Sequence, residues 1–237
     1  MVKKISALKH NDTDWNVTSK RFVAFIDIMG FKNIVATSTH EEVYEMMKKI
    51  NGHRESNASI DWIEENPHLI KTTTYSDSII IYSKDDSDES LYSIINTVSA
   101  LTNDLFSDGI PHKGAIAHGT MTLDTKNSIF FGQPLIDAYL IQEDLGFYGI
   151  VVHGTAEKIV VKSPHKSQFI KNYLCPFKNG SSFHLTIYPM FADEKEGSPL
   201  RDKRDKIHSS LQEFRFTTSG SLRRYIDNTK AYLETIE

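Results

Sequence analysis

Two aspartates stand next to strongly apolar segments of the chain. Asp27 follows a run of bulky residues in VAFIDIMGF, and Asp77 lies between two β-prone runs in TTYSDSIII. Carboxylate oxygens are the ligands that hard divalent cations such as Mg²⁺ prefer. Two such ions about 3.5–4 Å apart can activate one oxygen and neutralise a polyphosphate. The pair therefore predicts metal-assisted chemistry on a phosphorylated substrate, although either aspartate alone is more simply explained as a turn or cap residue.

The overall charge supports a role for cations. The 237 residues include 27 Lys and Arg and 31 Asp and Glu, which gives a formal net charge of −4. A dedicated DNA or RNA binder needs a basic surface to neutralise phosphates, so nucleic acid is not an expected partner. A nucleoside triphosphate would likewise be repelled by this chain unless divalent cations neutralised it.

The segment after Asp27 could contact an anion. In DIMGFK, residues 27–32, a strand ends in Asp and a tight turn at Gly30 leads into the next element. Backbone N–H groups presented by such a turn can bind phosphate oxygens. A plain turn glycine explains Gly30 equally well.

The elements that must position these residues follow from hydrophobic periodicity and turn signals. Strands are expected at 21–27, 68–75, 78–83, 113–123, 129–132, 149–153 and 183–191, and helices at 40–51, 91–105, 134–144 and 219–237, with one helical turn at 156–159 and a charged loop at 192–206. This order predicts an α+β, ferredoxin-like βαββαβ core with extensions. We expect a mixed, mostly antiparallel sheet with helices on one face. In that topology the first strand lies beside the central hairpin, so both aspartates reach the same edge.

The chain reads as one domain. We assign residues 1–19 to an N-terminal arm and residues 20–237 to a single domain, with a core at about 20–160 and an extension at 161–237. Cys175 is the only cysteine, which excludes an internal disulfide and favours a reducing compartment. Neither an apolar leader segment nor an apolar run of about 18 residues is present, so a cytoplasmic protein without a membrane partner is expected.

Four ordered motifs resemble class III nucleotidyl cyclases over roughly residues 20–155. FIDIMGFK resembles the first-strand motif Phe-x-Asp-Ile-x-Gly-Phe, and YSDSIII resembles the second motif, with Ser76 in place of its glycine. KGAIAHGTM resembles the later Arg-x-Gly-Ile-x-x-Gly strand, with Lys113 for Arg. FFGQPLIDAYLIQE falls where the family has Trp-Gly-x-x-Val-Asn and then Arg. Among the class, the chain looks most like the compact bacterial pyrimidine cyclases of Pycsar anti-phage defence.

The resemblance implies an activity and an assembly. UTP or CTP would be converted to cyclic UMP or cyclic CMP and pyrophosphate by a homodimer with active sites at the subunit interface. Asp27 and Asp77 would ligate two Mn²⁺ or Mg²⁺ ions, with the Ile28 carbonyl as a further protein ligand. The triphosphate would be held by the backbone of Met29, Gly30, Phe31 and Lys32.

The departures from the family pattern leave alternatives open. The transition-state Asn would fall at Ile136 and the Arg at Leu140, and neither is present. The purine-recognising Lys falls at Thr73 and its Asp near Phe130. A purine cyclase with a remodelled base pocket, or a cyclase-like domain that binds without turnover, therefore stays possible beside the pyrimidine cyclase.

Several residues are candidates for the vacant roles. Lys113, at a strand start, and Arg223 and Arg224, in the last helix, are candidate transition-state cations, with a solvated surface role as the alternative. Thr73 and Tyr75, beside the hairpin, could meet a base, and Tyr75, like Tyr139, could equally be core. We expect His118 to be a packed strand histidine and Cys175 to be inert.

Overall fold

A computed structural model describes residues 15–60, 68–163, 169–189 and 199–236. The predicted arm at 1–19 falls mostly outside these ranges, and its last two residues begin the first strand. The strands are β1 (Thr18–Ile28), β2 (Ile70–Tyr75), β3 (Ser78–Ser83), β4 (His112–Asp124), β5 (Ile129–Gly132), β6 (Ile150–Val152), β7 (Ile170–Phe177) and β8 (Gly180–Ile187). The helices are α1 (Phe31–Thr37), α2 (His40–Ala58), α3 (Asp88–Ser107), α4 (Gln133–Asp144), α5 (Gly154–Lys162), α6 (Pro199–Thr217) and α7 (Ser221–Leu233).

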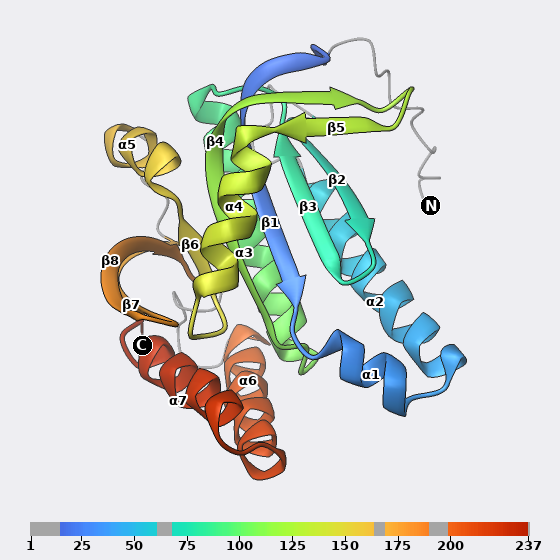
Figure 1. Ribbon diagram of the computed structural model, residues 1–237, viewed down its shortest axis with the longest axis vertical. Helices are drawn as coiled ribbons and strands as arrows, with labels where there is room; N and C mark the ends of the chain where they lie inside the picture. The colour runs from blue at the N-terminus through green and yellow to red at the C-terminus, as the bar shows by residue number, and fades with distance from the viewer. Residues whose placement is uncertain (1–14, 61–67, 164–168, 190–198, 237) are drawn as a thin grey trace.

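One mixed sheet organises the molecule (Figure 1). Its strand order is β2-β3-β1-β4-β6-β8-β7, and β5 pairs with β4 outside this path. The β4–β6 pair is parallel, and the other pairs are antiparallel. The order β2-β3-β1-β4, with α2 between β1 and β2 and α3 between β3 and β4, is the ferredoxin-like arrangement. The predicted fold class is therefore confirmed.

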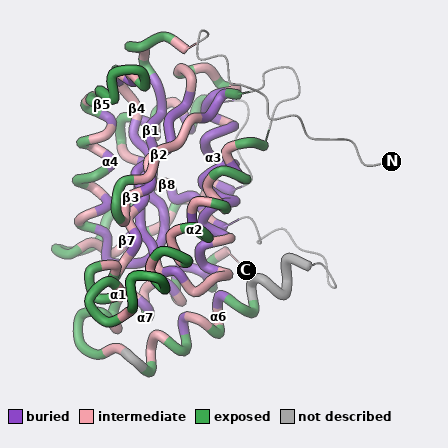
Figure 2. The backbone as a smooth tube through the Cα atoms, turned by 90° about the vertical axis from the view of Figure 1, so that its right-hand side faces the viewer, coloured by how far each residue is buried: buried purple, intermediate pink, exposed green. Residues whose placement is uncertain are grey.

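Helices cover both faces of the sheet, which corrects the expectation of one covered face. On the first face, alternate β1 residues such as Phe22, Ala24 and Ile26 share a core with α3 residues such as Ile94. On the second face, the core joins Phe25 to residues of α4, α6 and α7. Because both faces are apolar, β1 reads as a continuous buried run rather than an alternating one. Figure 2 shows this buried backbone concentrated in the strands and α3.

Three local expectations were wrong or incomplete. The helix expected to stop at Gly52 continues to Ala58, because one glycine costs a helix only about 1 kcal/mol and the Thr39–Glu42 capping box supports its start. The expected charged loop at 192–206 lies outside the described residues up to 198, and from Pro199 it is part of α6. The edge strand β7 was not predicted, because Pro176 interrupts its pattern, and edge strands tolerate proline.

The β2–β3 hairpin positions the second aspartate. It turns through Ser76 and Asp77, and Ser76 adopts a left-handed conformation with φ of 55°. That conformation is the usual reason for a glycine in a two-residue hairpin, so Ser76 holds it at some cost in backbone strain. The turn ends directly before Ser78, which pairs with Asp27 of β1.

Candidate active site

Asp27 and Asp77 come together at one end of the sheet. Asp27 pairs with Ser78 on one side and with Lys113 of β4 on the other. The carbonyl oxygen of Asp77 accepts a hydrogen bond of 3.0 Å from the amide of Ile28. This backbone contact ties the hairpin turn to the end of β1. The two residues named from sequence alone are therefore neighbours, as their strand positions predicted.

The charges around Asp27 disfavour its ionised form. Its pKa is raised to about 6, first by burial, then by the negative charge of Asp77 and, more weakly, of Glu143. Lys113 acts in the opposite direction and lowers the pKa of this carboxyl. Each contribution follows from an ordinary rule, since burial and like charges both penalise a carboxylate. A cation bound between the two aspartates would relieve this repulsion.

The donor atoms fit a hard divalent cation. Within the described parts of the chain, no group of three or more His, Cys, Asp and Glu side chains is placed to hold a metal ion. The side chains therefore supply two carboxylates, and a backbone carbonyl such as that of Ile28 is a ligand of the same oxygen type. The strained ionisation of Asp27 is the observation that favours a cation at this place.

Lys113 is held between three elements at the same end of the sheet. Its side chain is buried, and its Nζ donates to the backbone oxygen of Glu143 at 3.1 Å. The Nζ also lies 5.9 Å from the centre of the Tyr225 ring on α7. Burial lowers the pKa of Lys113, while the charges of Glu143 and Asp27 raise it. The end of α4 and helix α7 thus position the only cation that the motif comparison placed on β4.

Sequence reasoning did not identify Glu143 or Tyr225 as neighbours of Lys113. They lie 30 and 112 residues further along the chain, so no local spacing relates them to it. Glu143 ends an unremarkable exposed helix surface, and Tyr225 belongs to the apolar side of α7. The signal that joins them is tertiary packing on the second face of the sheet.

The loop after Asp27 is anchored to the neighbouring chain. The amide of Met29 donates to the carbonyl of Pro111 at 2.8 Å, so it is already engaged. Gly30 caps α1 in the left-handed conformation, with φ of 79°, which glycine adopts most easily. Since α1 has no side-chain cap, the amides of Phe31 and Lys32 are its first unsatisfied donors. Of the four predicted anion contacts, those at Gly30, Phe31 and Lys32 keep their geometric basis.

The other candidates are spread over separate surfaces. Thr73 lies on the edge strand β2, and Tyr75, at its end, is 81% exposed. Tyr139 contacts Phe25 edge-on, with 5.5 Å between ring centres. Arg224 is exposed on α7, and Arg223 donates to the backbone oxygen of Arg215 near the α6–α7 turn. The structure thus brings Asp27, Asp77 and Lys113 together and leaves Thr73 and both arginines elsewhere.

The two positions that lack the family's polar residues lie on the surface. Ile136 and Leu140 of α4 are 51% and 58% exposed. They are four residues apart and therefore occupy the same side of the helix. Exposed Ile129 and Phe131 of β5 directly precede this helix. An apolar surface thus replaces polar groups along β5 and α4.

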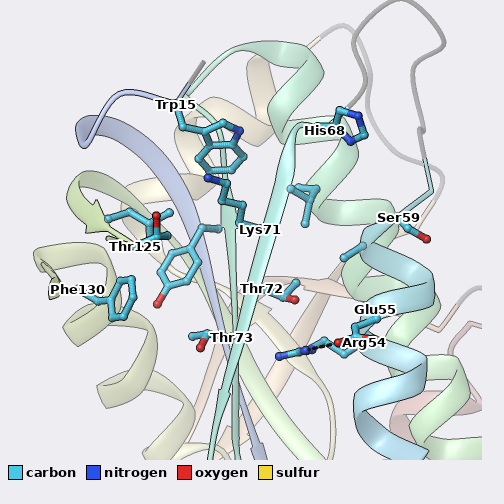
Figure 3. Close-up of a pocket in the computed structure, with 14 residues that line it drawn as sticks. Trp15, Arg54, Glu55, Ser59, His68, Lys71, Thr72, Thr73, Thr125 and Phe130 are labelled. Carbon is cyan, nitrogen blue, oxygen red and sulfur yellow. Dashed lines mark hydrogen bonds and ion pairs between the residues drawn. The ribbon is translucent and has the colours of Figure 1, made fainter. Parts of the chain in front are cut away.

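A cavity of about 630 Å³ borders the edge strand β2 (Figure 3). Its wall includes Trp15, Lys71, Thr73, Tyr82 and Phe130 on one side of the strand. Arg54 and Glu55 of α2, an ion pair at 3.1 Å, lie on the other side. Thr73 is the predicted base-contacting residue that the cavity contains, whereas Tyr75 does not line it.

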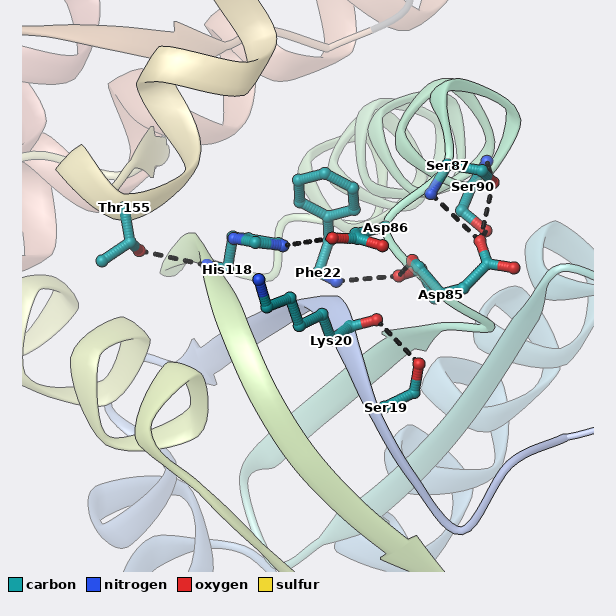
Figure 4. A network of polar contacts seen from close by, with 10 residues as sticks. Ser19, Lys20, Phe22, Asp85, Asp86, Ser87, Ser90, His118 and Thr155 are labelled. Carbon is teal, nitrogen blue, oxygen red and sulfur yellow. Dashed lines mark hydrogen bonds and ion pairs between the residues drawn. The ribbon is translucent and has the colours of Figure 1, made fainter.

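His118 and Cys175 occupy the structural roles expected of them. The ring of His118 packs 5.0 Å from that of Phe22, and its Nε2 lies 3.3 Å from Asp86 (Figure 4). Nearby, Asp85 accepts from Ser87 and Ser90 and so organises the start of α3. Cys175 is buried, and burial raises the pKa of its thiol to about 12, which keeps it protonated.

Comparison with known proteins identifies the fold. No family model matches the sequence, and no curated protein matches it. A bacterial light-regulated adenylyl cyclase is 10% identical, with 81% of this chain and 98% of that chain covered and a TM-score of 0.49. The catalytic core of a rhodopsin-guanylyl cyclase with converted specificity, in complex with ATPαS, is 11% identical, with 72% and 96% covered and a TM-score of 0.51. The chain has the fold of this second catalytic core.

A membrane role receives no support from the helices. No helix in the described ranges is long and apolar enough to cross a bilayer.

Proposed function

We propose that this protein is a nucleotide cyclase that converts a pyrimidine nucleoside triphosphate, UTP or CTP, to its 3′,5′-cyclic monophosphate and pyrophosphate. The observation that carries the proposal is the meeting of Asp27 and Asp77 at the end of β1 and the β2–β3 turn. Their fold is that of a guanylyl cyclase catalytic core. A role as an anti-phage defence signal follows from the motif resemblance alone.

The reaction forms one bond and breaks another. The ribose 3′-oxygen bonds to the α-phosphorus, the bond from that phosphorus to the pyrophosphate oxygen breaks, and the 3′-hydroxyl proton leaves to solvent. Asp27, Asp77 and the Ile28 carbonyl would hold two Mn²⁺ or Mg²⁺ ions. Ions bound there would lower the pKa of the 3′-hydroxyl and neutralise the leaving pyrophosphate. The amides of Gly30, Phe31 and Lys32 would orient the triphosphate, and Lys113 would keep the charge of Asp27 balanced.

The positions at Thr73 and Phe130 favour a pyrimidine. A site selects adenine strongly only when it offers hydrogen-bonding partners to the base edge, because shape alone discriminates weakly. Thr73 and Phe130 replace the charged pair that resembling cyclases use for this purpose. A purine cyclase is the second candidate, and it is favoured by the ATPαS complex of the fold neighbour. A binding module without turnover is the third, favoured by the apolar residues at Ile136 and Leu140.

A homodimer completes the proposal. The exposed apolar residues of β5 and α4 would be covered by a second copy of the chain, since contiguous exposed apolar surface marks interaction sites. The described residues near Asp27 include one buried cation, Lys113. A partner subunit could therefore supply a further basic residue to each site.

Incubation of the purified protein with ATP, GTP, CTP and UTP in competition, with Mn²⁺, tests the proposal. We expect cyclic UMP or cyclic CMP to form at least roughly tenfold faster than either purine product. Equal or faster formation of cyclic AMP or cyclic GMP would replace the pyrimidine assignment with the purine one. No product from any of the four would leave the binding module.

A further inference from the structure

The cavity beside β2 is built for a flat ligand. The rings of Tyr82 and Phe130 lie 6.4 Å apart and are nearly parallel, at 24°. Trp15 forms another wall, and its ring is held by two cations, with Lys71 Nζ at 4.6 Å and Arg21 Cζ at 5.3 Å from its centre. Arg21 is fully buried and donates to the backbone oxygens of Ser83 and Lys84. The aromatic walls are therefore fixed by the sheet rather than by loose surface contacts.

Tyr82 carries a buried hydroxyl that lacks a partner. The side chain is 1% exposed, and among the described residues its Oη makes no hydrogen bond. A buried hydroxyl without a partner is costly, and each such group in a folded protein calls for an explanation. An acceptor atom on a molecule in the cavity would satisfy it. Burial raises the pKa of Tyr82 to about 12, so the hydroxyl remains a donor at neutral pH.

The remaining lining suits a neutral, planar ring with a few polar atoms. Thr73 and Thr125 lie on the same side of the strand as Phe130 (Figure 3). The carboxylate of Glu55 lies on the opposite side and is paired with Arg54. Pockets that combine aromatic walls with a small number of polar groups are typical of small-molecule sites, and the volume is in their usual range. A nucleobase has this shape and this pattern of acceptors.

The cavity lies at a useful distance from the two aspartates. Thr73 precedes Asp77 by four residues on the same strand and hairpin, which corresponds to about 13 Å of extended chain. This span is comparable to the separation between the base and the phosphates of an extended nucleoside triphosphate. One surface of the sheet can therefore serve both ends of such a ligand.

We propose that this cavity binds the base of the substrate nucleotide, with the Tyr82 hydroxyl as a hydrogen-bond donor to the base and Trp15 as a wall. The inference rests on the proposed function, because it takes the substrate to be a nucleoside triphosphate. Tyr82 is then a specificity-determining residue, and Trp15 brings residues before β1 into the binding site.

The experiment uses the tryptophan of the cavity as a reporter. The chain has two tryptophans, so Trp62→Phe leaves Trp15 as the single source of tryptophan fluorescence. The ligands are the four 3′-deoxynucleoside triphosphates with Mn²⁺, which lack the 3′-hydroxyl and cannot cyclise. We expect the preferred one to change Trp15 emission, and Tyr82→Phe to raise its Kd roughly three- to tenfold. The matched control is Tyr44→Phe on the exposed surface of α2, which should leave Kd unchanged.

Stability separates recognition from a structural role. Because the hydroxyl has no partner in the protein, Tyr82→Phe should leave the unfolding midpoint unchanged or raise it. A lowered midpoint with an unchanged Kd would overturn the inference, as would ligand binding without any change in Trp15 emission. Cyclase turnover with a Tyr82-independent Kd would leave the proposed function standing and the inference wrong. Tyr82-dependent binding without turnover of any triphosphate would support the cavity and refute the cyclase.

Discussion

At the scale of single residues, the strongest feature is the ionisation of Asp27. Its pKa in the folded chain is about 6, above the ordinary value of 3.8, because of burial and the charge of Asp77. The folded state therefore binds a proton more tightly than the unfolded state between these values. Stability contributed by the protonated form is lost as pH rises through about 6. At neutral pH without a cation, the ionised carboxyl destabilises the fold.

Substitution of the two aspartates separates catalysis from stability. Asp27→Ala and Asp77→Ala should each abolish turnover, and the double variant should be no worse than either single one, because all three remove the same cation site. Asp27→Asn should also abolish turnover but raise the free energy of unfolding, measured with a chelator at pH 7.5, by roughly 1–2 kcal/mol after solvent screening. The control is Asp86→Asn beside His118, which should stay active. Full activity of either single alanine variant would refute the site.

At the scale of elements, β5 and α4 present an apolar surface that a folded monomer leaves exposed. Phe131 of β5 is 61% exposed, and the side of α4 that follows it carries Ile136 and Leu140. Side chains at alternate strand positions and at four-residue helix spacing share a face, so these residues form continuous surfaces. The lack of polar groups there is consistent with a protein partner rather than with substrate contact.

A charge placed on this surface tests the dimer. We expect the unmodified chain to sediment as a dimer at micromolar concentration, and Phe131→Glu or Leu140→Glu to produce a monomer with little activity, because a buried unpaired carboxylate is costly in an interface. Phe183→Glu on β8, where the phenylalanine is 66% exposed, is the matched control and should remain dimeric. A monomeric parent chain whose activity is linear in its concentration would contradict the dimer.

At the scale of the whole molecule, pH acts on stability through a buried histidine. His112 is fully buried on β4, its ring lies 4.5 Å from that of Phe106, and its Nδ1 contacts the carbonyl of Ile110 at 2.9 Å. Burial lowers the pKa of His112 to about 4, so the folded chain keeps it neutral where the unfolded chain is protonated. The unfolded state then binds more protons between pH 4 and 6.5, and stability falls as the solution becomes more acidic.

Denaturant unfolding at pH 7.5 and pH 4.5 checks this dependence. The contribution of His112 should approach about 3 kcal/mol across the window, and His112→Asn should flatten the slope while its amide keeps the contact with Ile110. Asp27 has the opposite sign over part of this range, so the comparison belongs in an Asp27→Asn background. An equal slope with and without His112 would show that other groups control the acid sensitivity.

Local pattern was enough to predict the elements of the core and the candidate metal ligands. The apolar run before Asp27, the two β-prone runs around Ser76 and Asp77, and the periodic helix α3 each carry their signal within a few residues. Strand order then follows from the few connections that a βαββαβ chain allows. The meeting of Asp27 and Asp77 could be predicted because each lies at the end of such an element.

Only tertiary structure decided what surrounds these residues. The contacts of Lys113 with Glu143 and Tyr225, and the cavity formed by Trp15, Tyr82 and Phe130, join side chains that are far apart in sequence. Such contacts depend on which faces pack together, and periodicity within one element does not encode that choice. The same reason explains why helices on the second face were not predicted: the apolar run of β1 marks it as buried without saying by what.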